Sequence, residues 1–76
     1  MASSDARMMY EAHMTLGLLH VVNARARVRR QIALIRRLQA HELDCALALE
    51  VLRLLRQSLA VDRTHLALLE KLCLRS

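Results

Sequence analysis

The chain has 76 residues, of which 55% are apolar, yet it contains one Gly, one Tyr and no Pro, Phe or Trp. A chain of this length forms at most one small domain, and its wealth of Leu, Ala and Arg favours helices and excludes a turn-rich sheet fold. The net charge of +5 comes almost wholly from arginine, because Lys71 is the only lysine, and it favours acidic partners such as nucleic acid or anionic membranes.

The first predicted helix covers about residues 4–39. Ser3, Ser4 and Asp5 can each cap its start, because their side-chain oxygens accept the free amide hydrogens of a first turn. Beyond them, apolar residues recur at alternating spacings of four and three, which is typical of a helix that packs along another helix. Arg25 occupies the one place in this series that is not apolar. The apolar members are Met14, Leu18, Val21, Val28, Ile32 and Ile35.

A turn is predicted at about residues 40–43, where the segment "QAHELD" breaks the spacing. Asp44 is a suitable N-cap for the helix that follows, at about residues 44–74. No Gly is present to end the first helix, so a hairpin requires His41 or Glu42 to adopt a left-handed conformation. A single uninterrupted helix is therefore the alternative to a hairpin.

The second predicted helix repeats the same spacing, and Asp62 occupies its one polar place. If the turn is centred near residue 42 or 43, Arg25 lies close to Asp62, and we expect this pair to set the register of the two helices. The fold predicted for residues 1–76 is a single all-α domain, a two-helix antiparallel hairpin. The apolar series of the second helix consists of Cys45, Ala48, Leu52, Leu55, Leu59, Leu66, Leu69 and Cys73.

Two helices cannot bury all the leucine in this chain. A second apolar row runs beside the first in the second helix, through Leu47, Val51, Leu54, Val61, Leu68 and Leu72. At about 25 cal/mol per Å² of apolar surface, leaving this row in water forfeits several kcal/mol and promotes aggregation. We therefore expect the hairpin to pair, either with itself as a homodimer that forms a four-helix bundle or with another helical protein. The predicted interface residues are Met14, Leu18, Val21, Val28, Ile32, Ile35, Leu52, Leu55, Leu59, Leu66 and Leu69.

Two segments, "RRQIALIRRLQAHELDCALALEVL" and "LAVDRTHLALLEKL", resemble a group of short proteobacterial proteins for which no activity is established. The pattern of that group is roughly R-Q-x-x-x-I-x-x-L, a turn, an Asp cap, an Ala/Leu run and a closing helix rich in His and Arg. The resemblance covers about residues 20–72 and implies a helical hairpin without implying an activity. The group usually has Gly in the turn, where this chain has Glu42. The matching residues are Arg30, Gln31, Ile35, Leu38, Asp44, Ala46 and His65.

Six arginines, with no acid among residues 23–37, are the strongest candidates for nucleic-acid contacts. At about 100° per residue they wrap the polar side of a helix instead of forming a narrow stripe, which is typical of a solvated or partner-facing surface. The aromatic side chains or the recognition helix of many nucleic-acid-binding proteins are missing. The arginines would nevertheless attract phosphate, so a small basic nucleic-acid-binding protein is the alternative function. They are Arg25, Arg27, Arg29, Arg30, Arg36 and Arg37.

Four histidines are candidates for a metal site, namely His13, His20, His41 and His65. In a hairpin His20 faces His65 and His13 comes near Cys73, and a dimer could bring two such pairs together around zinc. However, the chain has no CxxC or HExxH motif and no repeated Glu-x-x-His spacing. We therefore predict no metal and no other cofactor.

Catalysis is not expected, because so small a hairpin offers no pocket to hold several polar groups and its few acids are scattered. The stretch "LGLLHVV" is too short to span a membrane, and "SSDARMMYEA" has acids where a secretory signal has only positive charge. A basic helix could rest on an anionic membrane, but no Trp or Phe is present as an anchor. Cys45 and Cys73 lie too far apart on one helix to form a disulfide, and free thiols suit a cytoplasmic location. The sequence thus predicts a non-enzymatic protein–protein interaction module that serves as an assembly, adaptor or regulatory subunit.

Overall fold

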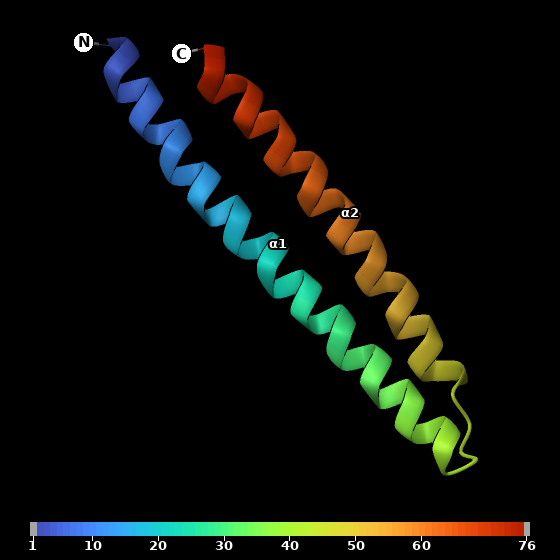
Figure 1. The fold of residues 1–76 in the computed structure, drawn as a ribbon. Coiled ribbons are helices and arrows are strands. Elements are labelled where there is room, and N and C mark those ends of the chain that lie inside the picture. The colour runs from blue at the N-terminus through green and yellow to red at the C-terminus, as the bar shows by residue number, and fades with distance from the viewer. Residues whose placement is uncertain (1, 76) are drawn as a thin grey trace.

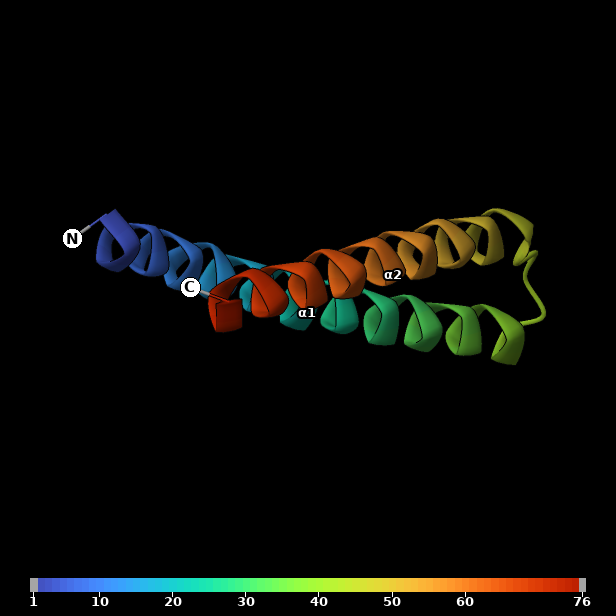
Figure 2. The same cartoon turned by 90° about the horizontal axis from the view of Figure 1, so that it is seen from above.

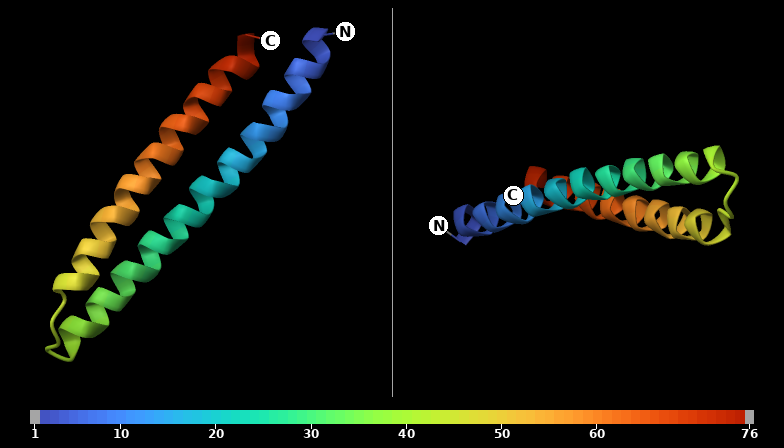
Figure 3. Two further views of the ribbon diagram at one scale, coloured as in Figure 1. Left: turned by 180° about the vertical axis from the view of Figure 1, so that it is seen from behind. Right: turned by 90° about the horizontal axis from the view of Figure 1, so that it is seen from below.

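The computed structural model describes residues 2–75, and it describes the side chains of residues 5–75. Helix α1 (Ala2–Ala40) and helix α2 (Ala46–Arg75) run antiparallel and side by side, joined by the turn 41–45 (Figure 1). The hairpin measures 62 × 14 × 13 Å between Cα atoms. This confirms the predicted all-α hairpin and excludes the single continuous helix. The helices cross at a shallow angle, and the start of α1 extends past the end of α2 (Figures 2 and 3).

Helix α1 begins at Ala2, slightly before the predicted start. Ser3, Ser4 and Asp5 therefore lie inside the helix instead of at its cap. The predicted capping by Ser3 and Ser4 concerns side chains that lie outside the described residues. Asp5 places an acid in the first turn, where the amide end of the helix dipole favours negative charge.

Glu42 ends helix α1 in a left-handed conformation, with φ at 57°. Its N–H donates to the carbonyl of Gln39 (3.0 Å), and the N–H of Leu43 donates to the carbonyl of Leu38 (2.9 Å), which is the Schellman arrangement. Glycine is favoured at this place because a Cβ there costs about 1–2 kcal/mol. Of the two residues predicted to take this conformation, it is therefore Glu42 and not His41 that does.

Glu42→Gly is expected to raise the free energy of unfolding by about 0.5–1 kcal/mol. The change relieves the left-handed strain, but part of the gain is lost because glycine also adds freedom to the unfolded chain. Urea unfolding at a fixed protein concentration measures the difference. Glu42→Ala is the matched control, because it removes the same carboxylate and keeps the Cβ. An equal gain in both variants would assign the effect to the carboxylate and contradict the backbone explanation.

Asp44 holds the start of helix α2. Its Oδ1 accepts the N–H of Ala46 at 2.9 Å, and the N–H of Leu49 donates to the carbonyl of Cys45 at 2.8 Å. The predicted capping role of Asp44 is therefore confirmed, although the helix begins at Ala46 and not at residue 44.

The two helices meet along a seam of buried and half-buried residues. Both sides of the seam follow an uninterrupted alternation of spacings of three and four, which is the pattern of coiled-coil packing. Gly17 faces Leu66 and Ala24 packs against Leu59, so small side chains of α1 make room for leucines of α2. The seam consists of Tyr10, Met14, Gly17, Val21, Ala24, Val28, Gln31, Ile35 and Leu38 in α1 and Cys45, Ala48, Leu52, Leu55, Leu59, Asp62, Leu66, Leu69 and Cys73 in α2.

The seam of α1 lies one residue earlier than predicted at three of its positions. Gly17, Ala24 and Gln31 occupy it, whereas Leu18 is exposed and Ile32 is half-buried beside the core. The prediction gave preference to large apolar side chains. The opposing leucines of α2 instead require small side chains across from them, so Leu18 is displaced to the outside of the hairpin.

Gln31 links the two helices by a hydrogen bond. Its Nε2 donates to the backbone carbonyl of Ala48 at 2.8 Å in a half-buried setting. Ala48 belongs to the core cluster with Ile35 and Leu52, so this polar contact lies among apolar neighbours. A directed bond of this kind favours one register of the hairpin over slipped ones.

Substitutions of Gly17 are expected to change stability in opposite directions according to size. A Cβ at this position would lie 3.3 Å from Cδ1 of Leu66 and 3.4 Å from Cδ1 of Leu69, both of which are ends of flexible side chains. Gly17→Ala should therefore stabilise the hairpin by roughly 0.5 kcal/mol through helix propensity, whereas Gly17→Leu should destabilise it by about 1–3 kcal/mol through overpacking. Thermal unfolding of both variants checks the sign. Stabilisation by leucine would mean that α1 and α2 do not approach closely here.

Candidate interaction surface

The hairpin leaves much of its surface in water. It exposes 6017 Å², about 1,300 Å² more than the roughly 4,700 Å² that a compact monomer of 8.7 kDa exposes on average. Because the two helices contact each other along a single line, even the core residues keep some exposure to solvent. Within the described part of the chain, no side chain is fully buried.

An exposed apolar row runs along α2, away from the seam. Leu47, Leu54, Val61 and Leu68 recur at intervals of seven residues, and Leu47 is 78% and Val61 67% exposed. Half-buried Val51 lies between the first two of them. We call these five residues the α2 stripe. At about 100° per residue, the stripe is centred about 110° around α2 from the seam, so the helix has two separate apolar faces.

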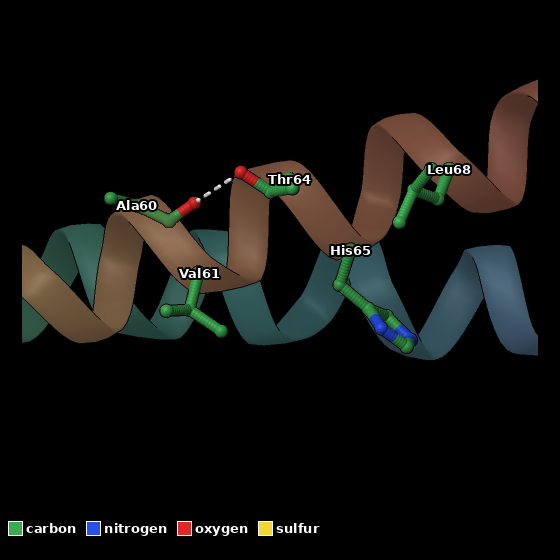
Figure 4. Close-up of a pocket in the computed structure, with 5 residues that line it drawn as sticks. All are labelled: Ala60, Val61, Thr64, His65 and Leu68. Carbon is green, nitrogen blue, oxygen red and sulfur yellow. Dashed lines mark hydrogen bonds between the residues drawn. The ribbon is translucent and has the colours of Figure 1, made fainter.

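A hollow of about 380 Å³ opens on the α2 stripe, lined by Ala60, Val61, Thr64, His65 and Leu68 (Figure 4). Val61, Thr64, His65 and Leu68 stand at positions i, i+3, i+4 and i+7. Four residues at these positions form the hole that receives a side chain of a facing helix in coiled-coil packing. The Thr64 hydroxyl donates to the carbonyl of Ala60 at 3.1 Å, so its hydrogen bond is made within α2. The hollow is therefore suited to an apolar side chain.

A second hollow, of about 410 Å³, lies at the other end of the α2 stripe. Leu47 and Val51 of the stripe line it together with Leu34 and Leu38 of α1. The stripe thus borders the groove between the two helices. A helix laid along the stripe would contact α1 as well as α2 at this end.

A polar hollow of about 310 Å³ separates the two apolar ones at the middle of the hairpin. His20, Asn23 and Arg27 of α1 line it from one side, and Ser58 and Asp62 of α2 line it from the other. Asp62 is half-buried because it occupies a seam position. Polar residues therefore interrupt the apolar surface at this level both in the seam and on the flank that carries the α2 stripe.

The predicted register pair of Arg25 and Asp62 is not formed. Arg25 is exposed, and no ion pair joins it to Asp62 within residues 2–75. Ala24 takes the seam position because it faces Leu59, and this places Arg25 outside the seam. Arg27, two residues further along α1, lines the same polar hollow as Asp62.

All six arginines of residues 25–37 are exposed, and they point to several sides of α1. None of them forms an ion pair in the described part of the chain, where the ion pairs are those of Arg7 with Glu11 and of Arg53 with Glu50. This segment therefore presents uncompensated positive charge. The arginines are Arg25, Arg27, Arg29, Arg30, Arg36 and Arg37.

Glu50 lies next to the α2 stripe, and Arg53 binds it. The Nε of Arg53 donates to both carboxylate oxygens of Glu50 at 3.1 Å. These hydrogen bonds are the main reason that the pKa of Glu50 lies below its ordinary value. The small stabilisation from this pair is complete above the ordinary pKa of a glutamate and is lost as the pH falls through the lowered one. Glu50 is therefore charged at neutral pH.

The candidate metal ligands are not gathered. Within residues 2–75, no group of three or more His, Cys, Asp and Glu could hold a metal ion. His20 lines the polar hollow and His65 lines the hollow of Figure 4, while Cys45 and Cys73 are free thiols. In the same part of the chain, neither helix has a stretch long and apolar enough to cross a membrane.

The hairpin belongs to the class of antiparallel coiled-coil-like helix pairs that carry a second, exposed apolar row. No protein-family model, curated protein or solved structure matches the chain. The resemblance to short proteobacterial proteins stays a prediction.

Proposed function

We propose that the protein is a non-enzymatic interaction module that buries the α2 stripe against another helical surface. The observation that carries this proposal is the spacing of the stripe together with the hollow at Val61, Thr64, His65 and Leu68. Helices that pack on one another need both features, a row of apolar side chains and holes between them.

The size of the exposed surface supports the same proposal. Stable protein–protein interfaces bury about 800 Å² on each partner, and the excess of about 1,300 Å² over a compact monomer is sufficient for such an interface. At about 25 cal/mol per Å², covering it would stabilise an otherwise weakly buried hairpin substantially. The partner would thus complete the core of this small chain.

A four-helix bundle is the architecture that we propose for the complex. A helix in such a bundle contacts two neighbours at once, and the two apolar faces of α2, about 110° apart, suit that arrangement. The partner is then a second hairpin or a protein with two similar helices. We propose a cytoplasmic location, supported by the free thiols of Cys45 and Cys73.

A mass measurement under native conditions tests the proposal. The purified chain is measured over a range of concentrations, and the chain in cell extract is measured alongside it. We expect a species heavier than one chain in at least one of the two. A compact monomer at high concentration that also migrates alone in the extract would remove the proposed function.

Nucleic-acid binding is the second candidate, and one observation favours it. The six arginines of residues 25–37 are exposed and have no acidic partner in the described part of the chain. A gel-shift titration against duplex DNA at two salt concentrations tests this function. Tight binding that weakens steeply with salt would support it, because neutralised phosphates release counterions, and no binding at low salt would remove it.

A further inference from the structure

We propose that the α2 stripe pairs with the α2 stripe of a second copy of this chain, in antiparallel orientation, about a two-fold axis at the level between Leu59 and Ala60. This inference rests on the proposed function and names its partner. It also specifies which residues of the two copies meet.

The spacing of the exposed row is the same from either end. The α2 stripe continues its alternation of four and three through the polar residues Ser58 and His65. From Val51 to Leu68, its six members lie at equal distances on the two sides of the point between Leu59 and Ala60. A two-fold axis at that level therefore places each of these six opposite another of them. The pairs so formed are Val51 with Leu68, Leu54 with His65, and Ser58 with Val61.

In this arrangement, a leucine side chain of the second copy fills the hollow of Figure 4. Leu54 of the second copy faces His65, which is one of the four lining residues 61, 64, 65 and 68 that form the hole. By symmetry, Leu54 of the first copy enters the hollow of the second. Leu68 of the second copy likewise meets Val51, at the edge of the hollow that Leu34 also lines. Each apolar hollow beside the stripe thus receives a leucine.

Charges beside the stripe are complementary in the same register. Positions flanking one side of an antiparallel helix pair face each other with a small offset, as Leu34 and Val51 do beside the packed residues Ile35 and Ala48. The corresponding offset beside the α2 stripes places Glu50 of one copy opposite Lys71 of the other, twice in the dimer. Within one chain these two side chains lie about 32 Å apart along α2, at about 1.5 Å per residue, and cannot pair.

The polar hollow selects this register over its neighbours. Ser58 and Asp62, which line it, lie close to the level of the two-fold axis. The polar hollows of the two copies therefore open toward each other. A slip of seven residues would set Ser58 against Leu54 or Leu68 and would separate Glu50 from Lys71. Polar groups that meet only in one register are a known means of specifying helix pairing.

Charge reversal tests the pairing, with the dissociation constant of the dimer measured by sedimentation equilibrium. Glu50→Lys and Lys71→Glu should each weaken the dimer roughly 5- to 30-fold, because each creates two pairs of like charges. The chain that carries both changes should return to within about 3-fold of the original affinity, since the pairs are restored with reversed sign. The control is Glu70→Lys, an exposed acid on a different flank of α2, which should change the affinity by less than about 2-fold.

The outcomes separate this inference from the proposed function. A chain that self-associates but is not rescued by the double change would overturn the antiparallel pairing and leave the proposed function in place. A chain that is monomeric alone but enters a larger complex in cell extract would have a different partner, which also overturns the self-pairing only. Helicity of each variant, followed by circular dichroism, shows that the loss of the Glu50–Arg53 pair has not unfolded the chain.

Discussion

Leu59→Asp is expected to unfold the hairpin. Leu59 is 8% exposed and packs against Val21 and Ala24 of α1, so a carboxylate there loses the packing of the leucine and has no cationic partner in the cluster. Such a change costs several kcal/mol. A chain of this size has about 4–11 kcal/mol of stability in total, at about 0.05–0.15 kcal/mol per residue, and a hairpin with so little buried surface lies at the low end.

Far-UV circular dichroism measures this loss as a fall in helicity at low temperature. Leu74→Asp is the matched control, because it makes the same change on the same helix at a side chain that is 88% exposed. It should leave the helical signal unchanged. If Leu59→Asp remained as helical as Leu74→Asp, the seam would not be the core of this chain.

Val61→Asp is expected to keep the hairpin folded and to abolish its association. Val61 is 67% exposed in the single hairpin, so a carboxylate there remains hydrated as long as the chain is alone. In the complex the same carboxylate is enclosed against another helix. In a symmetric dimer two such charges are enclosed, and an expected cost of about 1.5–3 kcal/mol for each weakens the dimer roughly 100-fold or more.

Size-exclusion chromatography with mass detection, over a range of concentrations, follows the change in assembly. Leu49→Asp serves as the comparison, since Leu49 is also exposed on α2 but lies on the flank away from the stripe. That variant should assemble like the original chain. Equal loss of assembly in both variants would mean that the interface is not the α2 stripe.

The α2 side of the seam could be predicted in full, and the α1 side only in part. In α2, leucine or another apolar residue occupies nearly every seam position, so hydrophobic periodicity alone is sufficient. In α1, the seam passes through Gly17 and Gln31, which rank below their neighbours Leu18 and Ile32 in hydrophobicity, and through Ala24, which the spacing counted from Leu18 replaced with Arg25. The available signal was the uninterrupted alternation of three and four along both helices, which is complete in α1 only if the small and polar residues are included.

The ends of the helices could also be predicted only in part. The left-handed conformation near the turn was predictable, because a hairpin without glycine must place some other residue there, and Glu42 is that residue. The start of α1 was placed too late, because Ser3, Ser4 and Asp5 are all good caps and propensity does not show that the helix begins before them. The position of Arg25 depended on the α1 seam and was therefore wrongly placed along with it.

The constant spacing of the seam layers has a consequence for the length of this molecule. Every second layer lies seven residues further along α1 and seven residues back along α2, so the same contact geometry repeats from the turn to the open end. Removing seven residues from one helix and the opposite seven from the other would shorten the hairpin by about 10 Å and leave the remaining layers matched. Length is thus an adjustable property of this architecture, provided that insertions and deletions occur in both helices together.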